Sequence, residues 1–191
     1  NKNSLTKFQV LSKPKVKIMG VISWPDFLRF AKELISISDR LCDGWRLETL
    51  DENCVGEVYI MKKELKSQIS TKREKDKEPE SMPYIWEYHI LYSPSYSVPV
   101  FYFKVSDSKG RYLQADEIIS MLNIDTESCP KIQNVISQTE HPILRKPYYY
   151  LHPCHTAEFI FPESANNKLI SWLSCISNTV NLNLSLAYAK H

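Results

Sequence analysis

Two neighbouring strand-like segments limit the fold of this chain more than any other feature. Residues 84–93 and 98–105 are rich in large apolar residues, and in the first segment Tyr and other apolar side chains recur at every second position. Only Pro94-Ser95-Tyr96-Ser97 separates the two segments, which is short enough for a hairpin. Such alternation is typical of a sheet covered mainly on one face. The chain therefore contains antiparallel strands.

Further patterns predict a mixed fold around this hairpin. Residues 45–50 and 55–65 favour a second pair of strands, and residues 148–151 favour a short strand. Apolar residues at helical spacing predict helices over residues 23–44, 115–123 and 167–180, with a turn of helix near 132–137. Ser23 is suited to cap the first helix, since Pro25 and Asp26 follow it. The expected class is α+β, with a four-stranded antiparallel sheet flanked by helices.

The domain organisation is simple. A chain of 191 residues, 43% of them apolar, is one ordinary domain with its own core. We expect residues 1–22, which are basic and weakly patterned, to form a loosely held arm before a single domain over 23–191. Residues 66–82 are rich in Lys and Glu and contain no large aromatic side chain. We expect a flexible, solvated loop there.

Charge and cysteine content exclude several classes of protein. A net charge of +2 gives little attraction for nucleic acid, and no stretch approaches the ~18 consecutive apolar residues of a membrane span. Five cysteines without a Cys-x-x-Cys pair indicate free thiols in a reducing compartment. The start of the chain has no apolar core of a signal peptide. We therefore expect a cytoplasmic protein that binds no nucleic acid and does not insert stably into membranes.

Cys154 is the candidate nucleophile. The apolar run 148–151 ends in His152-Pro153-Cys154-His155, which sets a thiol between two imidazoles. Pro153 fixes its own φ angle and keeps His152 extended, so the loop is stiff. Imidazolium neighbours lower the pKa of a thiol from about 8.5 and increase the fraction present as thiolate. This pattern favours a displayed, reactive cysteine over a packed one.

Three other interpretations of Cys154 stay open. In the simplest interpretation, Cys154 is a buried structural thiol at the end of a strand. A zinc site would draw on His152, Cys154, His155 and Cys175, but structural zinc sites usually bring paired ligands from two places. A cysteine protease would recruit His89 or His141, although no local protease signature surrounds the thiol.

Several stretches resemble the autophagy E2-like conjugating enzymes. Residues 150–159, Tyr-Leu-His-Pro-Cys-His-Thr-Ala-Glu-Phe, contain the His-Pro-Cys that these enzymes carry at the catalytic cysteine. Residues 86–93 with 95–103, 137–144, and 170–174 with 182–189 are similar to further family stretches in the same order. The resemblance runs, with gaps, from about Ile22 to Ala189. It is closer to the branch that acts on a protein acceptor than to the sister enzyme of the lipid-conjugated modifier.

The resemblance implies an E2-like fold and a transferase role in autophagosome formation. The E1-like autophagy-related protein 7 would pass the ubiquitin-like autophagy-related protein 12 to Cys154 as a thioester. A lysine of autophagy-related protein 5 would then attack that thioester. The loop residues His152, Pro153, His155 and Thr156 would support the cysteine. The activating enzyme uses the ATP, so neither a cofactor nor a metal is expected in this chain.

One departure from the ubiquitin E2 pattern leaves the oxyanion donor open. Those enzymes use the asparagine of a His-Pro-Asn motif upstream of the cysteine, whereas Ile143 follows His141-Pro142 here. The candidates for a donor or a supporting residue are Asn134, Gln138, Tyr96, Thr156 and His141. A catalytically inactive E2-like interaction module and a cysteine hydrolase are the alternative functions.

Overall fold

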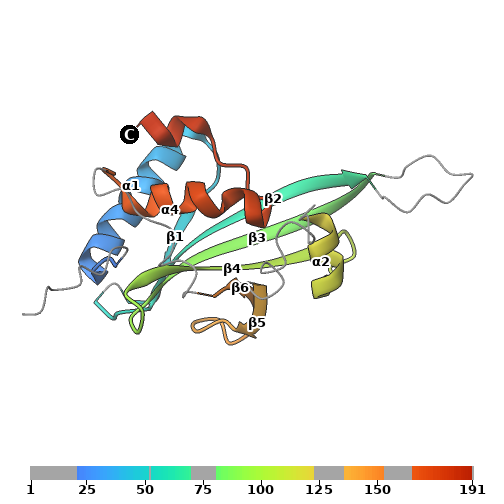
Figure 1. Ribbon diagram of the computed structural model, residues 1–191, viewed down its shortest axis with the longest axis horizontal. Helices are drawn as coiled ribbons and strands as arrows, with labels where there is room; N and C mark the ends of the chain where they lie inside the picture. The colour runs from blue at the N-terminus through green and yellow to red at the C-terminus, as the bar shows by residue number, and fades with distance from the viewer. Residues whose placement is uncertain (1–20, 52, 70–80, 123–135, 153–164, 191) are drawn as a thin grey trace, which may run out of the picture.

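The computed structural model describes residues 21–51, 53–69, 81–122, 136–152 and 165–190 (Figure 1). Its main elements are α1 (Trp24–Leu41), β1 (Arg46–Thr49), β2 (Val58–Ile69), β3 (Ser81–Ser93), β4 (Val98–Asp107), α2 (Ala115–Met121), β5 (Ile136–Glu140), β6 (Pro147–Leu151) and α4 (Lys168–Ile176). Two 3-10 helices follow, η2 (Ser177–Val180) and η3 (Leu186–Lys190). No helix among these described residues is long and apolar enough to cross a membrane.

The strands form one antiparallel sheet in the order β1-β2-β3-β4-β6-β5. The expected α+β class is confirmed, and the first four strands lie close to where the sequence predicts them. The sheet has six strands rather than the expected four, because β5 and β6 extend it beyond β4. Helices α1 and α4 cover one face of the sheet, as Figure 1 shows, and share a core with it.

The first helix begins as the sequence predicts. The hydroxyl of Ser23 accepts a hydrogen bond from the backbone N–H of Asp26 at 3.2 Å, and Pro25 occupies the first turn. The helix ends at Leu41, because Cys42 adopts a left-handed conformation with a φ of 54°. Left-handed backbone after the last helical residue is a common helix stop. Gly44 therefore lies beyond the helix end.

Two boundaries differ from the prediction. The predicted turn of helix near 132–137 is wrong where the structure describes it, since Ile136–Glu140 is a strand paired with β6. Its partner strand follows only after a turn, and a short window of sequence does not reveal that pairing. The expected loop over 66–82 is narrower, because Lys66 pairs with Tyr84 and Ile69 with Ser81. Residues 70–80 of that loop lie outside the described residues.

The end of the expected arm also belongs to the domain. Residues 1–20 lie outside the described residues, but Ile22 is buried. Its backbone N–H donates to the carbonyl of Ser97 at 2.8 Å, and its carbonyl accepts a hydrogen bond from the Tyr92 hydroxyl at 3.0 Å. Ile22 thereby fastens the start of α1 to the turn between β3 and β4.

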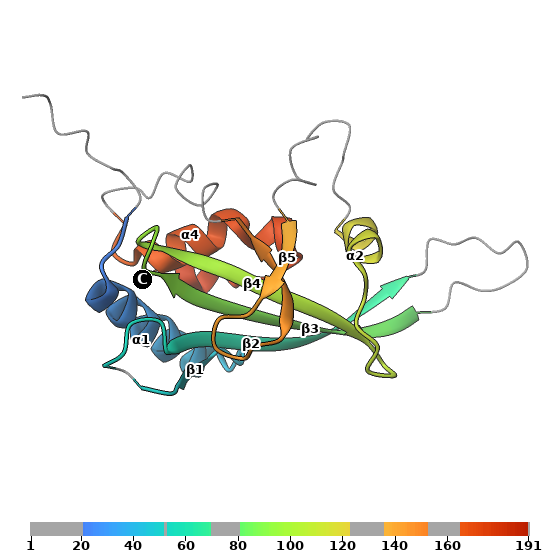
Figure 2. The same ribbon diagram turned by 90° about the horizontal axis from the view of Figure 1, so that it is seen from below.

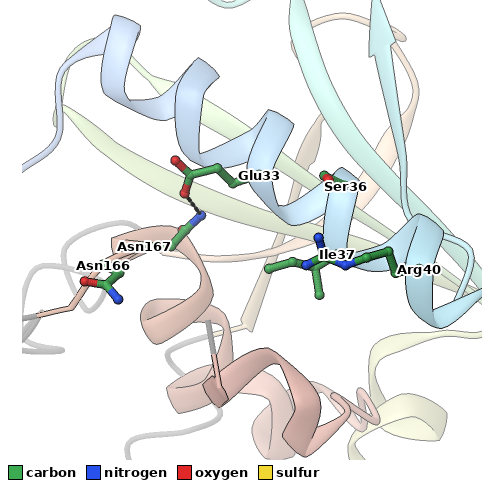
Figure 3. A pocket seen from close by; sticks show the side chains of 6 residues that line it. All are labelled: Glu33, Ser36, Ile37, Arg40, Asn166 and Asn167. Carbon is green, nitrogen blue, oxygen red and sulfur yellow. Dashed lines mark hydrogen bonds between the residues drawn. The ribbon is translucent and has the colours of Figure 1, made fainter.

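Asn167 fastens α4 to α1. Its side-chain oxygen caps α4 by accepting from the N–H of Ile170 at 3.0 Å. Its amide nitrogen donates to the carbonyl of Phe30 at 3.0 Å and to the Glu33 carboxylate at 2.9 Å. Figure 3 shows this junction beside a hollow of about 360 Å³ between the two helices. One amide thus satisfies groups on both helices, which fixes their relative position.

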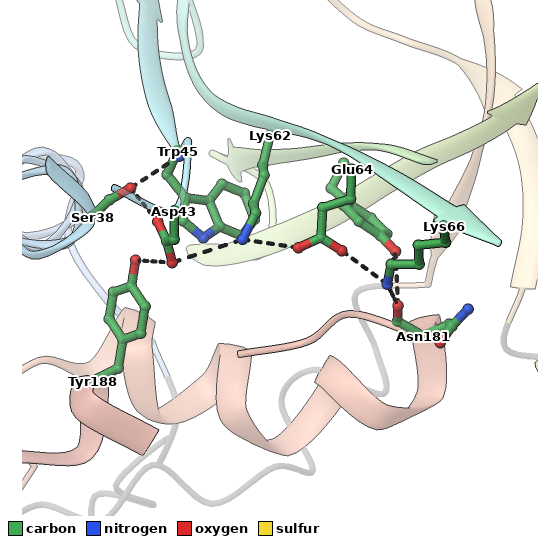
Figure 4. A network of polar contacts seen from close by, with 9 residues as sticks. Ser38, Asp43, Trp45, Lys62, Glu64, Lys66, Asn181 and Tyr188 are labelled. Carbon is green, nitrogen blue, oxygen red and sulfur yellow. Dashed lines mark hydrogen bonds and ion pairs between the residues drawn. The ribbon is translucent and has the colours of Figure 1, made fainter. Parts of the chain in front are cut away.

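A chain of alternating charges joins β2 to both ends of the domain (Figure 4). Lys62, whose side chain is only 6% exposed, lies 2.9 Å from Glu64 and 3.7 Å from Asp43. Asp43 also accepts hydrogen bonds from the Ser38 and Tyr188 hydroxyls. Each buried charge therefore has a partner of opposite sign, as burial requires.

The same chain continues along β2. The Lys66 ammonium lies 2.9 Å from Glu64 and donates to the Tyr88 hydroxyl and the carbonyl of Asn181. Tyr88 donates to that carbonyl as well, at 2.9 Å. These contacts hold the segment after α4 against β2.

We expect Lys62→Met to lower the free energy of unfolding by about 3 kcal/mol, because it removes the cation beside the partly buried Asp43 and leaves Glu64 with Lys66 alone. Methionine resembles the apolar part of the lysine side chain, so the loss of unfolding free energy reflects the removal of the charge. Urea denaturation measures it. The control is Arg145→Ala, which breaks an exposed pair with Glu140 and should cost less than about 1 kcal/mol. Equal losses in the two variants would contradict a structural role for the charge chain.

Candidate active site

The structure describes the approach to the candidate nucleophile. Cys154, Pro153, His155, Thr156 and Asn134 lie outside the described residues. Strand β6 and His152 lead directly to them, and β6 pairs with β4 through Tyr150–Tyr102 and Tyr149–Phe103. The position of His152 therefore depends on how β6 is held on the sheet.

A hollow of about 500 Å³ lies beside His152. The side chains that line it include Tyr96, Tyr102, Thr139, Pro142, Tyr150 and His152. The ring centroid of His152 lies 5.9 Å from that of Tyr150 and 6.3 Å from that of Tyr96. The hollow thus has aromatic walls that carry hydroxyl groups, and it lies next to the residues that precede Cys154.

Tyr96 is held at this place by the β3–β4 turn. Ser97 has a positive φ of 53°, and its N–H donates to the carbonyl of Ser93 at 2.8 Å. The carbonyl of Ser97 in turn accepts the N–H of Ile22. Tyr96 is 51% exposed at the edge of the hollow. Among the predicted donors that the structure describes, Tyr96 is the one that lines the hollow together with His152.

Gln138 and His141 lie elsewhere. Gln138 is exposed on β5 and does not line the described part of the hollow, whereas its neighbour Thr139 does. His141 is fully buried, and its Nδ1 accepts the N–H groups of Ile143 and Leu144 at 3.2 and 3.1 Å. Its Nε2 lies 3.0 Å from Nδ1 of His89. Both ring nitrogens are engaged, so His141 supports the β5–β6 turn and has no donor left for a substrate.

Burial governs the ionisation of His141. Loss of solvent and the neighbouring His89 lower the pKa of His141 from 6.5 to about 3. The imidazole is therefore neutral throughout the physiological range. A neutral ring is what its two backbone hydrogen bonds require, since Nδ1 accepts in both of them.

A buried carboxylate on β3 lies next to the histidine pair. Glu87 accepts a hydrogen bond from the Tyr148 hydroxyl at 2.6 Å and lies 3.2 Å from Nε2 of His89. Lys63 and Lys104 lie 3.0 and 3.2 Å from its carboxylate. Burial raises the pKa of Glu87, but hydrogen bonds from His89 and Tyr148 together with the lysines hold that pKa below its usual range. Glu87 is thus a charged anchor for three neighbouring strands.

Sequence analysis missed this cluster, although a signal was present. Glu87 and His89 interrupt the apolar pattern of β3 at every second position, so they share one face of the sheet. In-register pairing sets Lys63 and Lys104 on either side of Glu87. Two polar residues on one face of an apolar strand indicate a buried polar cluster.

The zinc alternative finds no support in the described part of the chain. Cys175 is exposed on α4, and among the described residues no group of three histidine, cysteine or acidic side chains is arranged to hold a metal ion. Cys154 and His155 lie outside those residues, so this finding concerns only His152 and Cys175 among the four predicted zinc ligands.

Comparison with known proteins gives a consistent result. Residues 26–187 match the model of the autophagocytosis associated protein, active-site domain. The chain is 42% identical over 119 residues to the ubiquitin-like-conjugating enzyme ATG10 of Homo sapiens, covering 55% of this chain and 52% of that protein. The proteins of the same name from Arabidopsis thaliana and Dictyostelium discoideum are each 32% identical, over 124 and 127 residues.

The chain spans about half the length of the curated relatives it matches. The matched family model covers most of the chain, and the relatives carry the name of the branch to which the sequence stretches pointed. The resemblance to the autophagy E2-like enzymes, and within them to autophagy-related protein 10, is confirmed. The chain therefore belongs to the autophagocytosis-associated protein family, which it matches through the active-site domain.

Proposed function

We propose that this chain is an E2-like transferase that carries a ubiquitin-like modifier as a thioester on Cys154. The observation that supports the proposal best is the hollow beside His152, two residues before the cysteine of the His-Pro-Cys motif. The relatives are named as ubiquitin-like-conjugating enzymes, which agrees with this chemistry. Site, motif and family point to acyl transfer through a thiol.

The partners follow from the family. The E1-like autophagy-related protein 7 supplies autophagy-related protein 12, and a lysine of autophagy-related protein 5 accepts it in autophagosome formation in the cytoplasm. The activating enzyme consumes ATP before transfer. This chain then needs no cofactor of its own.

Two exchanges at one carbonyl carbon complete the reaction. The Cys154 thiolate attacks the modifier's C-terminal thioester on the activating enzyme, and the thiolate of that enzyme leaves. The amine of the acceptor lysine then attacks the new thioester, Cys154 leaves as thiolate, and the amine loses a proton as the isopeptide bond forms. Each step passes through a tetrahedral oxyanion, which hydrogen-bond donors stabilise. We assign the Tyr96 hydroxyl as one such donor, since Tyr96 lines the hollow with His152.

Charging of Cys154 tests the proposal. We expect the wild-type chain, incubated with the activating enzyme, ATP and autophagy-related protein 12, to form an adduct that reductant removes. Cys154→Ala should form none, and Cys154→Ser should form an ester that resists reductant. Non-reducing gels measure all three. Failure of the wild type to charge while the activating enzyme charges would contradict the proposal and favour an inactive interaction module, whereas rapid turnover of peptide substrates would favour a hydrolase.

The Tyr96 assignment has its own test. Tyr96→Phe should slow discharge of the thioester to an amine by about tenfold or more, since a single oxyanion donor is often worth at least that much. Tyr102→Phe is the control, because it removes a hydroxyl from the same hollow but from the central strand β4. Single-turnover discharge, followed on gels, gives both rates. Equal rates in Tyr96→Phe and the wild type would refute the assignment.

His152 is expected to tune the thiol. His152→Ala should move the pH midpoint of Cys154 alkylation by iodoacetamide upward, because an imidazolium near a thiol stabilises the thiolate. The same substitution should also slow formation of the thioester on Cys154. The alkylation rate is measured against pH with thermal unfolding as a check on stability. An unchanged alkylation profile in a variant of reduced stability would assign His152 a purely structural role.

A further inference from the structure

The β5–β6 hairpin is joined to the rest of the sheet by a short backbone ladder. Tyr150 pairs with Tyr102 and Tyr149 with Phe103, whereas β5 and β6 pair with each other along five positions. The turn between them, residues 141–146, folds back over β3 toward β2, as Figure 2 shows. Side-chain contacts beneath this turn must therefore fix the hairpin, and with it His152 at the end of β6.

His89 and His141 supply the central contact. Both side chains are essentially buried, at 1% and 0% exposure. Nδ1 of His141 accepts two backbone N–H groups of its own turn, so its proton is on Nε2 and points at Nδ1 of His89, 3.0 Å away. Nδ1 of His89 must then accept, which leaves the His89 proton on Nε2, 3.2 Å from the Glu87 carboxylate. The geometry fixes one tautomer for each ring.

This arrangement has no place for another proton. Protonation of His141 would set an N–H at Nδ1 against the N–H groups of Ile143 and Leu144. Protonation of His89 would set an N–H against that of His141. Either event turns an attractive contact into a repulsive one, and the two rings themselves are buried.

The surroundings determine the response to acid. The titratable and charged side chains that face the pair are Tyr59 and Lys63 from β2, Glu87 from β3, Tyr102 and Lys104 from β4, and Tyr148 from β6. Glu87 favours protonation of the pair, but it is already shared between two lysines and the Tyr148 hydroxyl. Burial and the second imidazole oppose protonation and prevail for His141.

We propose that His89 and His141 are a positioning pair that holds the β5–β6 hairpin, and through it His152, in place only while the His141 imidazole is neutral. Acid then releases the hairpin from the sheet before the rest of the domain unfolds. The consequence for thioester formation rests on the proposed function, whereas the release of the hairpin does not.

The direction of the pH dependence follows from the pKa of His141. This pKa is about 3 in the folded chain and 6.5 for an ordinary histidine, so the released state binds the proton more tightly. The hairpin is held most firmly on the sheet above about pH 6.5. Below that pH the equilibrium constant for its release rises by up to ~10-fold for each pH unit. Protonation of Glu87 adds to this only in more acidic solution, since its pKa is lowered from 4.5.

Amide hydrogen exchange of the full chain, followed by NMR between about pH 7.5 and about pH 5, tests the proposal. We expect the protection of the Ile143 and Leu144 amides, corrected for intrinsic exchange, to fall by up to ~10-fold per pH unit below 6.5. The amides of Ile60 and Tyr88 in the central sheet should stay better protected than these two at every pH, because they exchange only when more of the domain opens. Constant protection at Ile143 and Leu144 across this range would overturn the proposal.

Two variants separate the effect of His141 titration from simple loss of the turn. In His141→Asn the side-chain oxygen still accepts the two backbone N–H groups but does not titrate, so protection should persist and no longer depend on pH. His141→Ala removes the acceptor, and protection should be low at every pH. Wild-type pH dependence in His141→Asn would overturn the proposal. These measurements need no partner protein, so their outcome is independent of whether Cys154 carries a thioester.

Discussion

The buried carboxylate of Glu87 is the charge on which the second face of the sheet depends. A buried carboxylate without partners would cost several kcal/mol, and here Tyr148, His89, Lys63 and Lys104 surround it. These partners come from β6, β3, β2 and β4, so the contacts that stabilise this one carboxylate connect four strands. Backbone pairing alone joins β6 to β4 at only two positions. The strand that leads to the candidate nucleophile is therefore positioned by this polar cluster together with the apolar packing of Tyr148, Tyr149 and Leu151.

The opposite face is fixed by different means. There α1 and α4 bury the alternating aromatic side chains of β3 and β4, and the charge chain through Lys62 and Glu64 closes the sheet against the C-terminal segment. Both faces of the sheet are packed against other parts of the chain, whereas the hollow beside His152 is open. A rigid sheet with an open, hydroxyl-lined hollow suits acyl transfer, because donors placed in advance stabilise an oxyanion without reorganising.

The local patterns of the sequence predicted most of the fold. Helical spacing and the cap at Ser23 located α1, and period-two alternation located β3 and β4. The strand at Ile136–Glu140 was missed because its five residues carry little apolar pattern and gain their partner only in three dimensions. For the site, the His-Pro-Cys motif predicts Cys154 as the nucleophile, whereas the Glu87 cluster depends on contacts between residues more than sixty positions apart. The register between strands so far apart in the chain is set when the sheet folds, and it cannot be predicted from a single sequence.

The proposed acyl transfer passes through one thiol, that of Cys154. Mass-spectrometric peptide mapping of the charged chain, digested without reductant, tests it most directly. We expect the C-terminal residues of the modifier on the peptide that contains Cys154 and on no other cysteine peptide. Attachment at Cys42, Cys54 or Cys175, with the Cys154 peptide unmodified, would contradict it.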